Sequence, residues 1–220
     1  LAKERVEKMG EKNVYYCGSP SLDTILKVPL YTKEEIFKKY NLENKPTAIL
    51  LQHPLSTAPE KSEEHINATI QALKEENVQT LAIYPNSDPG HEAIFKAIDE
   101  SGFQAHKSIP HKDYLSLIKH SDILIGNSSS GMIDVSAFPM TTIDIGMRQE
   151  GREHGINVIH CEHDKEEIKA AIKKALSSEF KAEISTPNSP YGNGTASQKI
   201  AEVLATVEIN HDLLQKQITY

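Results

Sequence analysis

The chain has 220 residues, of which 38% are hydrophobic and 25% charged, and its formal net charge is −7. This length is enough for one good core or at most two small ones, and no apolar run is long enough to cross a membrane. The negative charge argues against nucleic acid as a partner, because binding to a phosphate backbone requires a basic face.

Apolar runs that predict strands alternate with amphipathic patterns that predict helices along most of the chain. From the N-terminus, strands are predicted at residues 13–17, 47–52, 79–84, 103–106, 123–125, 141–145 and 157–161. Helices are predicted at residues 1–10, 32–40, 62–77, 91–101, 114–118, 164–176 and 195–206, with a final one over residues 208–220. Thr32 and Glu35 form a capping box at the start of the second helix. The alternation indicates an α/β fold with a mostly parallel sheet and helices on both faces.

The stretch over residues 121–152 carries the strongest local signals. Its apolar run stops at Gly126 and passes through Asn127 and three serines into a helical pattern, which predicts a strand, a small polar turn and a helix start. Asn127 or Ser128 can cap this helix, and the unpaired N–H groups of a helix start favour an anion. The same residue types also occur at helix starts that bind nothing.

Two arginines, Arg148 and Arg152, follow the strand predicted at residues 141–145. Open α/β sheets bind ligands beyond the carboxyl ends of their strands, and guanidinium groups suit phosphate oxygens. The alternative is that both arginines pair with Glu150 and Glu153 on the surface.

The motifs G-N-S-S-S-G at residues 126–131 and D-I-G-M-R-Q-E-G-R-E-H-G at residues 144–155 closely resemble the C-terminal domain of hydrolysing UDP-N-acetylglucosamine 2-epimerases. Further matches follow the same order and are found at residues 17–23, 51–54, 84–88 and 191–194. The resemblance therefore covers about residues 14–207, nearly the whole chain.

This resemblance implies a Rossmann-like UDP-binding domain over residues 1–220, the C-terminal half of a two-domain fold of the glycosyltransferase-B type. Residues 1–12 and 208–220 are then expected to contact an N-terminal domain that this chain lacks, and a start at leucine rather than methionine fits a fragment. A homo-oligomer is expected from the relatives, and neither a cofactor nor a metal is implied. The two cysteines, Cys17 and Cys161, have no disulfide or metal-ligand pattern, which fits a reducing cytoplasm.

Four candidate site residues match the family positions that meet the phosphates. His53 follows a buried strand, and the matching histidine contacts the phosphate end of the nucleotide sugar and takes part in catalysis. Ser128 and Ser129 match the serines that hold the diphosphate, and Arg148 matches an arginine near the phosphates. For Arg152, surface pairing is the better expectation.

Three further candidates are Asn86, Ile109 and Asp134. Asn86, like Asp88, could be a turn former at the end of a strand, whereas the resemblance favours a ligand contact for Asn86. Ile109 matches a position whose backbone meets the uracil, which is compatible with core packing. Asp134 falls where the family commonly has a glutamate that binds both ribose hydroxyls, and its shorter side chain either reaches them or loses the contact.

The implied reaction removes the C2 proton of UDP-N-acetylglucosamine, expels UDP to leave a glycal, and adds water to give N-acetylmannosamine. The carboxylates that handle the C2 proton belong to the missing domain. Three alternatives stay open: a non-hydrolysing epimerase of the same fold, a related UDP-sugar glycosyltransferase, and a nucleotide-binding module without catalysis. The short motif over residues 52–54 looks more like the hydrolysing branch.

Overall fold

The computed structural model describes residues 2–215, apart from the side chain of Asp212, and it divides into two compact units. One unit comprises residues 28–190, and the other comprises residues 2–27 with residues 191–215. The strands are β1 (Thr47–Leu51), β2 (Gln79–Ile83), β3 (Gln104–His106), β4 (Ile123–Gly126), β5 (Thr141–Ile145) and β6 (Val158–Cys161). The α-helices are α1 (Ala2–Lys8), α2 (Pro20–Lys27), α3 (Lys33–Lys39), α4 (Ser62–Glu75), α5 (His91–Ser101), α6 (His111–His120), α7 (Ser129–Ile133), α8 (Lys165–Leu176), α9 (Ser178–Glu183), α10 (Ala196–Thr206) and α11 (His211–Leu214).

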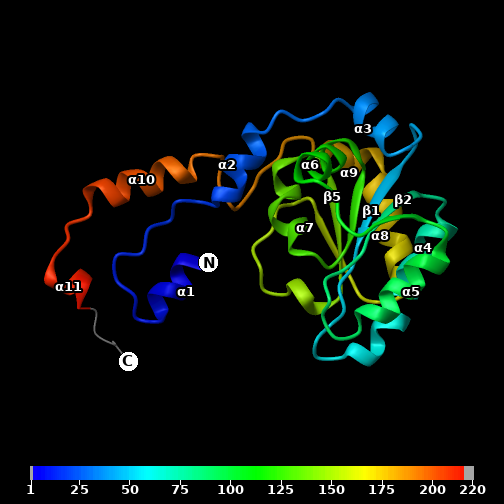
Figure 1. Ribbon diagram of the computed structural model, residues 1–220, viewed down its shortest axis with the longest axis horizontal. Helices are drawn as coiled ribbons and strands as arrows, with labels where there is room; N and C mark the ends of the chain where they lie inside the picture. Colours follow the sequence, from blue (N-terminus) through cyan, green and yellow to red (C-terminus); the bar gives the residue numbers. More distant parts are fainter. Residues whose placement is uncertain (1, 216–220) are drawn as a thin grey trace. The chain divides into compact units, whose positions relative to one another are not determined.

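The larger unit is built on one six-stranded sheet in the order β3-β2-β1-β4-β5-β6 (Figure 1). All neighbouring strands are parallel, so their carboxyl ends lie at one edge. From β1 the chain moves outward to β2 and β3, and then returns to place β4 on the other side of β1. The loops after β1 and β4 therefore leave in opposite directions, which makes this edge a topological switch point.

Helices cover both faces of this sheet (Figure 1). Helices α4, α5 and α8 pack on one face, where Ile66 and Leu73 of α4 are fully buried against strand residues such as Leu50. Burial of each such side chain contributes about 1.5–3 kcal/mol. On the other face α7 lies close to β5, because a Cβ on Gly131 would be only 2.6 Å from Cγ2 of Thr142. The predicted α/β class is confirmed.

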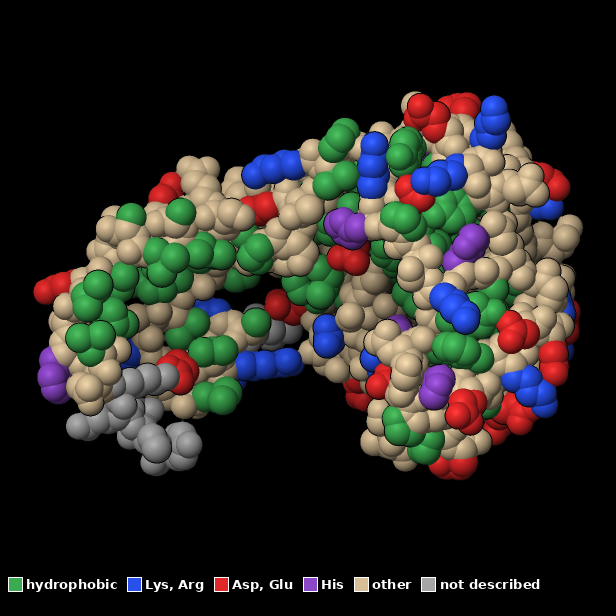
Figure 2. Space-filling model, in the orientation of Figure 1, with side chains coloured by type: hydrophobic (Ala, Val, Ile, Leu, Met, Phe, Trp, Pro, Cys, Tyr) green, Lys and Arg blue, Asp and Glu red, His purple; other side chains and the backbone are tan. Residues whose placement is uncertain are grey.

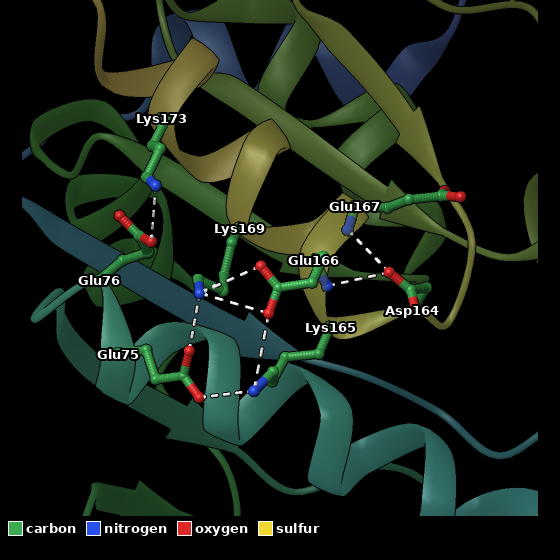
Figure 3. Close-up of polar contacts among 8 residues, drawn as sticks. All are labelled: Glu75, Glu76, Asp164, Lys165, Glu166, Glu167, Lys169 and Lys173. Carbon is green, nitrogen blue, oxygen red and sulfur yellow. Dashed lines mark hydrogen bonds and ion pairs between the residues drawn. The ribbon is translucent and has the colours of Figure 1, made fainter.

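Ion pairs between α4 and α8 join two helices that are distant in sequence (Figure 3). The Glu75 carboxylate lies 2.7 Å from Lys165 Nζ and 2.8 Å from Lys169 Nζ. Asp164, the N-cap residue of α8, accepts hydrogen bonds from the first backbone N–H groups of that helix. The charges lie on the solvent side of helices whose other faces enter the core, as their periodicity predicts.

The smaller unit is held together by Asp23 of α2. Its carboxylate is buried and accepts hydrogen bonds from the N–H groups of Ala196 and Ser197, at 3.0 and 2.6 Å, which caps the start of α10. Hydrogen bonding from Ser197 lowers the pKa of Asp23. Figure 2 shows hydrophobic side chains gathered along α10 and α11. The large hydrophobic residues exposed in this unit are Val6, Met9, Tyr15, Tyr16, Leu26, Leu204, Ile209, Leu213 and Leu214.

Several predicted elements require correction. The strand predicted at residues 13–17 is wrong: these residues pair with no described strand, Asn13 has a φ of 56°, and the side chains of Tyr15 and Tyr16 are exposed. The final helix is short, since α11 ends at Leu214, and the predicted part beyond residue 215 lies outside the described residues. Helices α2 and α9 were not predicted, although Pro20 at the first helical position is a common start signal.

Candidate functional site

The site lies where β1 and β4 end side by side. Gly126 closes β4 with a φ of 139°, and a Cβ on this residue would lie 2.1 Å from the carbonyl oxygen of Leu51. Only glycine allows this approach, because any side chain would clash with the neighbouring backbone. His53, two residues after β1, and Asn127, directly after β4, are consequently brought into contact.

Asn127 links the two loops through its amide side chain. Its Oδ1 accepts a hydrogen bond from the His53 N–H at 2.7 Å, and its Nδ2 donates to the His53 carbonyl at 2.9 Å. The Asn127 carbonyl also accepts from Arg148 Nη1 at 3.0 Å and from Gln149 Nε2 at 2.7 Å. Since Asn127 is only 1% exposed, these bonds are shielded from water and fix the position of both the histidine and the arginine.

A cavity of about 380 Å³ opens beside this link. Six of the seven candidate residues line it, namely His53, Asn86, Ile109, Ser128, Ser129 and Arg148. Lys107 and Tyr114 also line it, and the sequence reasoning did not select them. Lys107 directly follows β3, so its place at the carboxyl edge of the sheet was the signal that could have identified it. The cavity thus combines two cations with hydroxyl groups and an imidazole.

The geometry favours one protonation state of His53. Burial lowers the pKa of its imidazole, and the charge of Arg148 lowers this pKa further against the opposing effect of Asp88. The backbone N–H of Asn86 points at Nδ1 over 3.5 Å, so Nδ1 acts as an acceptor. The neutral ring therefore carries its proton on Nε2, and this N–H can donate to a ligand oxygen.

Asp134 lies behind the serine turn and is absent from the residues that line the cavity. Its Oδ2 accepts a hydrogen bond from the Ser130 hydroxyl at 2.7 Å, and that hydroxyl also contacts the Tyr114 hydroxyl at 2.5 Å. Burial raises the pKa of Asp134. Ser128 is the N-cap of α7, and its Oγ accepts from the Ser130 N–H at 3.3 Å. The Ser128 hydroxyl proton remains available to a ligand.

Asp88 and Arg152 do not line the cavity of about 380 Å³. The Asp88 carbonyl accepts from the His91 N–H at the start of α5, which is a turn role. Arg152 lines a second and larger cavity of about 790 Å³ at the ends of β5 and β6, and it makes no ion pair with any of the described residues. The surface pairing expected for Arg152 stays a prediction.

The part of the chain that the structure describes contains neither a cluster of metal-ligating side chains nor a membrane-spanning helix. Among residues 2–215, no three His, Cys, Asp or Glu side chains converge as a metal cluster. None of the helices within that range has the length and apolar content needed to span a membrane. Both cysteines are free thiols, and burial raises the pKa of Cys161 to about 12.

A polar cavity at the switch point of a parallel sheet, lined by cations and hydroxyl groups, is the usual place for a ligand in an open α/β protein. The family profile described as UDP-N-acetylglucosamine 2-epimerase matches residues 1–205. The chain therefore belongs to the UDP-N-acetylglucosamine 2-epimerase family.

Individual relatives agree with this membership. The UDP-N,N'-diacetylbacillosamine 2-epimerase (hydrolyzing) of Legionella pneumophila is 29% identical over 226 residues, which cover 100% of this chain and 59% of the relative. The UDP-N-acetylglucosamine 2-epimerase of Neisseria meningitidis serogroup B is 30% identical over 225 residues, which cover 98% and 58% of the two chains. The chain thus spans about three-fifths of the length of these relatives.

A solved structure shows the same fold. The crystal structure of UDP-GlcNAc 2-epimerase from Neisseria meningitidis bound to UDP-GlcNAc superposes with a TM-score of 0.75 at 13% identity. The match covers 94% of this chain and 59% of that one.

Proposed function

We propose that this chain is the UDP-binding half of a hydrolysing UDP-N-acetylglucosamine 2-epimerase, which converts UDP-N-acetylglucosamine and water to N-acetylmannosamine and UDP. The observation that carries the proposal is the cavity at the switch point, which is lined by Arg148, Ser128, Ser129 and His53 together. Support for the hydrolysing type comes from the name of the Legionella relative, while the Neisseria relative bears the epimerase name alone.

Each of these groups has a task in holding a diphosphate. Arg148 brings a permanent positive charge, and its bond to the Asn127 carbonyl uses one N–H while leaving others for phosphate oxygens. The hydroxyl groups of Ser128 and Ser129 can each donate to the diphosphate. The Nε2–H of neutral His53 supplies a further donor in a largely water-excluded place.

The same groups favour departure of UDP. When the C2 proton is removed, the bond from C1 to the phosphate oxygen breaks, and its electron pair leaves with the diphosphate as a C1–C2 double bond forms. The added negative charge on the leaving group is stabilised by the preorganised donors of Arg148, Ser128 and His53. Water then adds across the double bond. The carboxylates that move the C2 proton are assigned to the N-terminal domain.

The smaller unit supports the two-domain part of the proposal. It exposes many large apolar side chains, among them Ile209 at 74% and Leu214 at 67%. Exposed apolar surface of this extent is typical of an interface with another domain or chain. We therefore assign residues 1–12 and 208–220 to contacts with an N-terminal domain of the same protein.

A homo-oligomer in the cytoplasm completes the proposal. The free state of both cysteines supports a reducing compartment, and the family resemblance supports the oligomer. Size-exclusion chromatography with light scattering of the full-length protein tests the oligomeric state, and a single-chain mass would exclude it.

Calorimetric titration with UDP, UMP, GDP and ADP tests the nucleotide site. We expect UDP to bind better than the other three. Arg148→Ala should weaken UDP binding about tenfold to a hundredfold, as loss of a charge-assisted hydrogen bond does. Arg152→Ala is the matched control, because Arg152 lines the other cavity, and it should leave UDP affinity unchanged. Equal weakening by both variants, or no preference for UDP, would overturn the assignment.

Product analysis with the full-length protein tests the reaction. Free N-acetylmannosamine and UDP in equal amounts would support hydrolysis, whereas UDP-N-acetylmannosamine would identify a non-hydrolysing epimerase. Transfer of the sugar to an acceptor would identify a glycosyltransferase. UDP binding without turnover would identify a nucleotide-binding module.

A further inference from the structure

A second group of polar side chains lies at the edge of the sheet, outside the nucleotide cavity. Asp144 of β5 and His160 of β6 are paired neighbours in the strand register, so their side chains project from the same face. His154 reaches them from the loop between these strands. Both histidines line the cavity of about 790 Å³.

One nitrogen of each imidazole is held by an oxygen acceptor. His160 Nδ1 lies 2.9 Å from Asp144 Oδ2, and His154 Nδ1 lies 3.1 Å from the carbonyl oxygen of Gly155. Both Nδ1 atoms must therefore carry a hydrogen, which leaves both Nε2 atoms as lone-pair donors in the neutral rings. These Nε2 atoms face each other at 3.2 Å.

Two lone pairs at this distance repel each other unless a proton on one of the rings or a metal ion beside both nitrogens removes the repulsion. A tetrahedral zinc ion with Zn–N bonds of about 2.0–2.1 Å separates its two nitrogen ligands by about 3.3 Å. The second contact of each ring also has the arrangement found around bound metals, where a ligating histidine donates its other N–H to a carboxylate or a backbone carbonyl.

We propose that His154 and His160 bind one divalent transition-metal ion of the zinc class through their Nε2 atoms, with Asp144 as the positioning carboxylate. Imidazole ligands suit zinc, nickel and copper better than magnesium or calcium. Water or a ligand in the cavity completes the coordination, because residues 2–215 offer no third side chain for a metal cluster. The His160 side chain is 48% exposed, so an ion can reach it from solvent.

The environment of Asp144 agrees with a bound cation. This side chain is 1% exposed, and its Oδ1 has no hydrogen-bond partner among the described residues. A buried carboxylate with one hydrogen bond is costly unless a positive charge lies close by. A divalent ion on His160 supplies that charge through the imidazole.

The other close histidine pair has a different geometry. The rings of His65 and His163 stack in parallel, with centroids 3.6 Å apart and an interplanar angle of 4°. Because the nitrogen lone pairs lie in the ring planes, stacked rings direct them side by side and not toward a shared point. His65→Gln is therefore a matched control that removes one member of a histidine pair.

Zinc binding is measured by calorimetric titration of the full chain, freed of any affinity tag, with zinc chloride in a buffer that does not chelate metals. We expect one site in the parent protein. His154→Gln and His160→Gln should each lower zinc affinity at least tenfold. Asp144→Asn should lower it about tenfold to a hundredfold, as loss of an outer-sphere partner does. His65→Gln should bind as the parent does. X-ray absorption at the zinc edge should report two imidazole ligands.

Thermal melting of each variant establishes whether it is folded. If Asp144→Asn is not folded, zinc binding by the two histidine variants still tests the proposal. The proposal is overturned if millimolar zinc produces no binding heat, if zinc binding survives loss of either His154 or His160, or if His65→Gln weakens it equally. It does not depend on the nucleotide site, since UDP titration of the same variants reports that site separately.

Discussion

Replacement of Asn127 by alanine is the sharpest test of how the two central loops are held together. In the parent protein the Asn127 amide satisfies both backbone groups of His53, at 2.7 and 2.9 Å. Alanine at this position offers no polar atom in the side chain. The His53 N–H and carbonyl then lose their partners at a residue that is only 8% exposed.

The magnitude follows from these two groups. A buried polar group without a partner costs about 1–3 kcal/mol, so two such groups lower the free energy of unfolding by roughly 2–6 kcal/mol. For a domain of this size each kcal/mol lowers the melting temperature by about 2–4 °C, and a loss of about 4 kcal/mol corresponds to about 8–16 °C. UDP affinity should fall as well, because His53 is no longer fixed beside Arg148.

Thermal melting followed by circular dichroism measures the first effect, and calorimetry with UDP measures the second. Asn44→Ala is the control, since Asn44 is exposed and its loss should change stability by less than about 0.5 kcal/mol. A melting temperature for Asn127→Ala within about 3 °C of the parent, with unchanged UDP affinity, would refute the reasoning.

Two further predictions concern the sheet and its helices. Gly126→Ala places a Cβ at 2.1 Å from the Leu51 carbonyl oxygen with a φ of 139°, and it should lower the melting temperature by about 5 °C or more. Hydrogen bonds from two lysines of α8 lower the pKa of Glu75 from its ordinary value of 4.5 to about 2. A depressed carboxyl pKa stabilises the fold above pH 4.5, and this stabilisation is lost as the pH falls toward 2. The difference in melting temperature between the parent and Glu75→Gln should therefore shrink as the pH is lowered from 4.5 to 2. A difference that does not change with pH would contradict the argument.

The centre of the sheet could be predicted from the sequence because β1, β2, β4 and β5 are almost fully buried. Thr141–Ile145 and His91–Ser101 have the predicted bounds, and the capping box of Thr32 and Glu35 is present. In these segments local propensity and burial favour the same structure, so apolar runs and helical periodicity are sufficient evidence.

The smaller unit was predicted less well for a physical reason. Residues 13–17 have the composition of a strand, yet a strand forms only where another can pair with it. Helix α2 begins directly after a Gly-Ser pair that resembles a turn, and its role depends on Asp23 reaching α10 across a large sequence separation. Contacts of this kind have no local signature.

The candidate site shows the same division. Residue types and resemblance were enough to select six residues that line one cavity, since each follows a strand or begins a helix. Residue types and resemblance could not show that the Asp134 carboxylate turns to the Ser130 hydroxyl and away from the cavity. That direction depends on where the short helix α7 begins and ends.

The position of Arg148 joins these observations. Its guanidinium would be free to sample many rotamers at the surface, but a bond to the Asn127 carbonyl at 3.0 Å holds it at the cavity. That carbonyl belongs to the residue whose side chain fixes His53, so one buried asparagine orders a cation from the β5 loop and an imidazole from the β1 loop. Groups ordered before the ligand arrives lose less entropy on binding. Sequence motifs identify Arg148 and His53, whereas the hydrogen bonds of Asn127 hold both side chains at the same cavity.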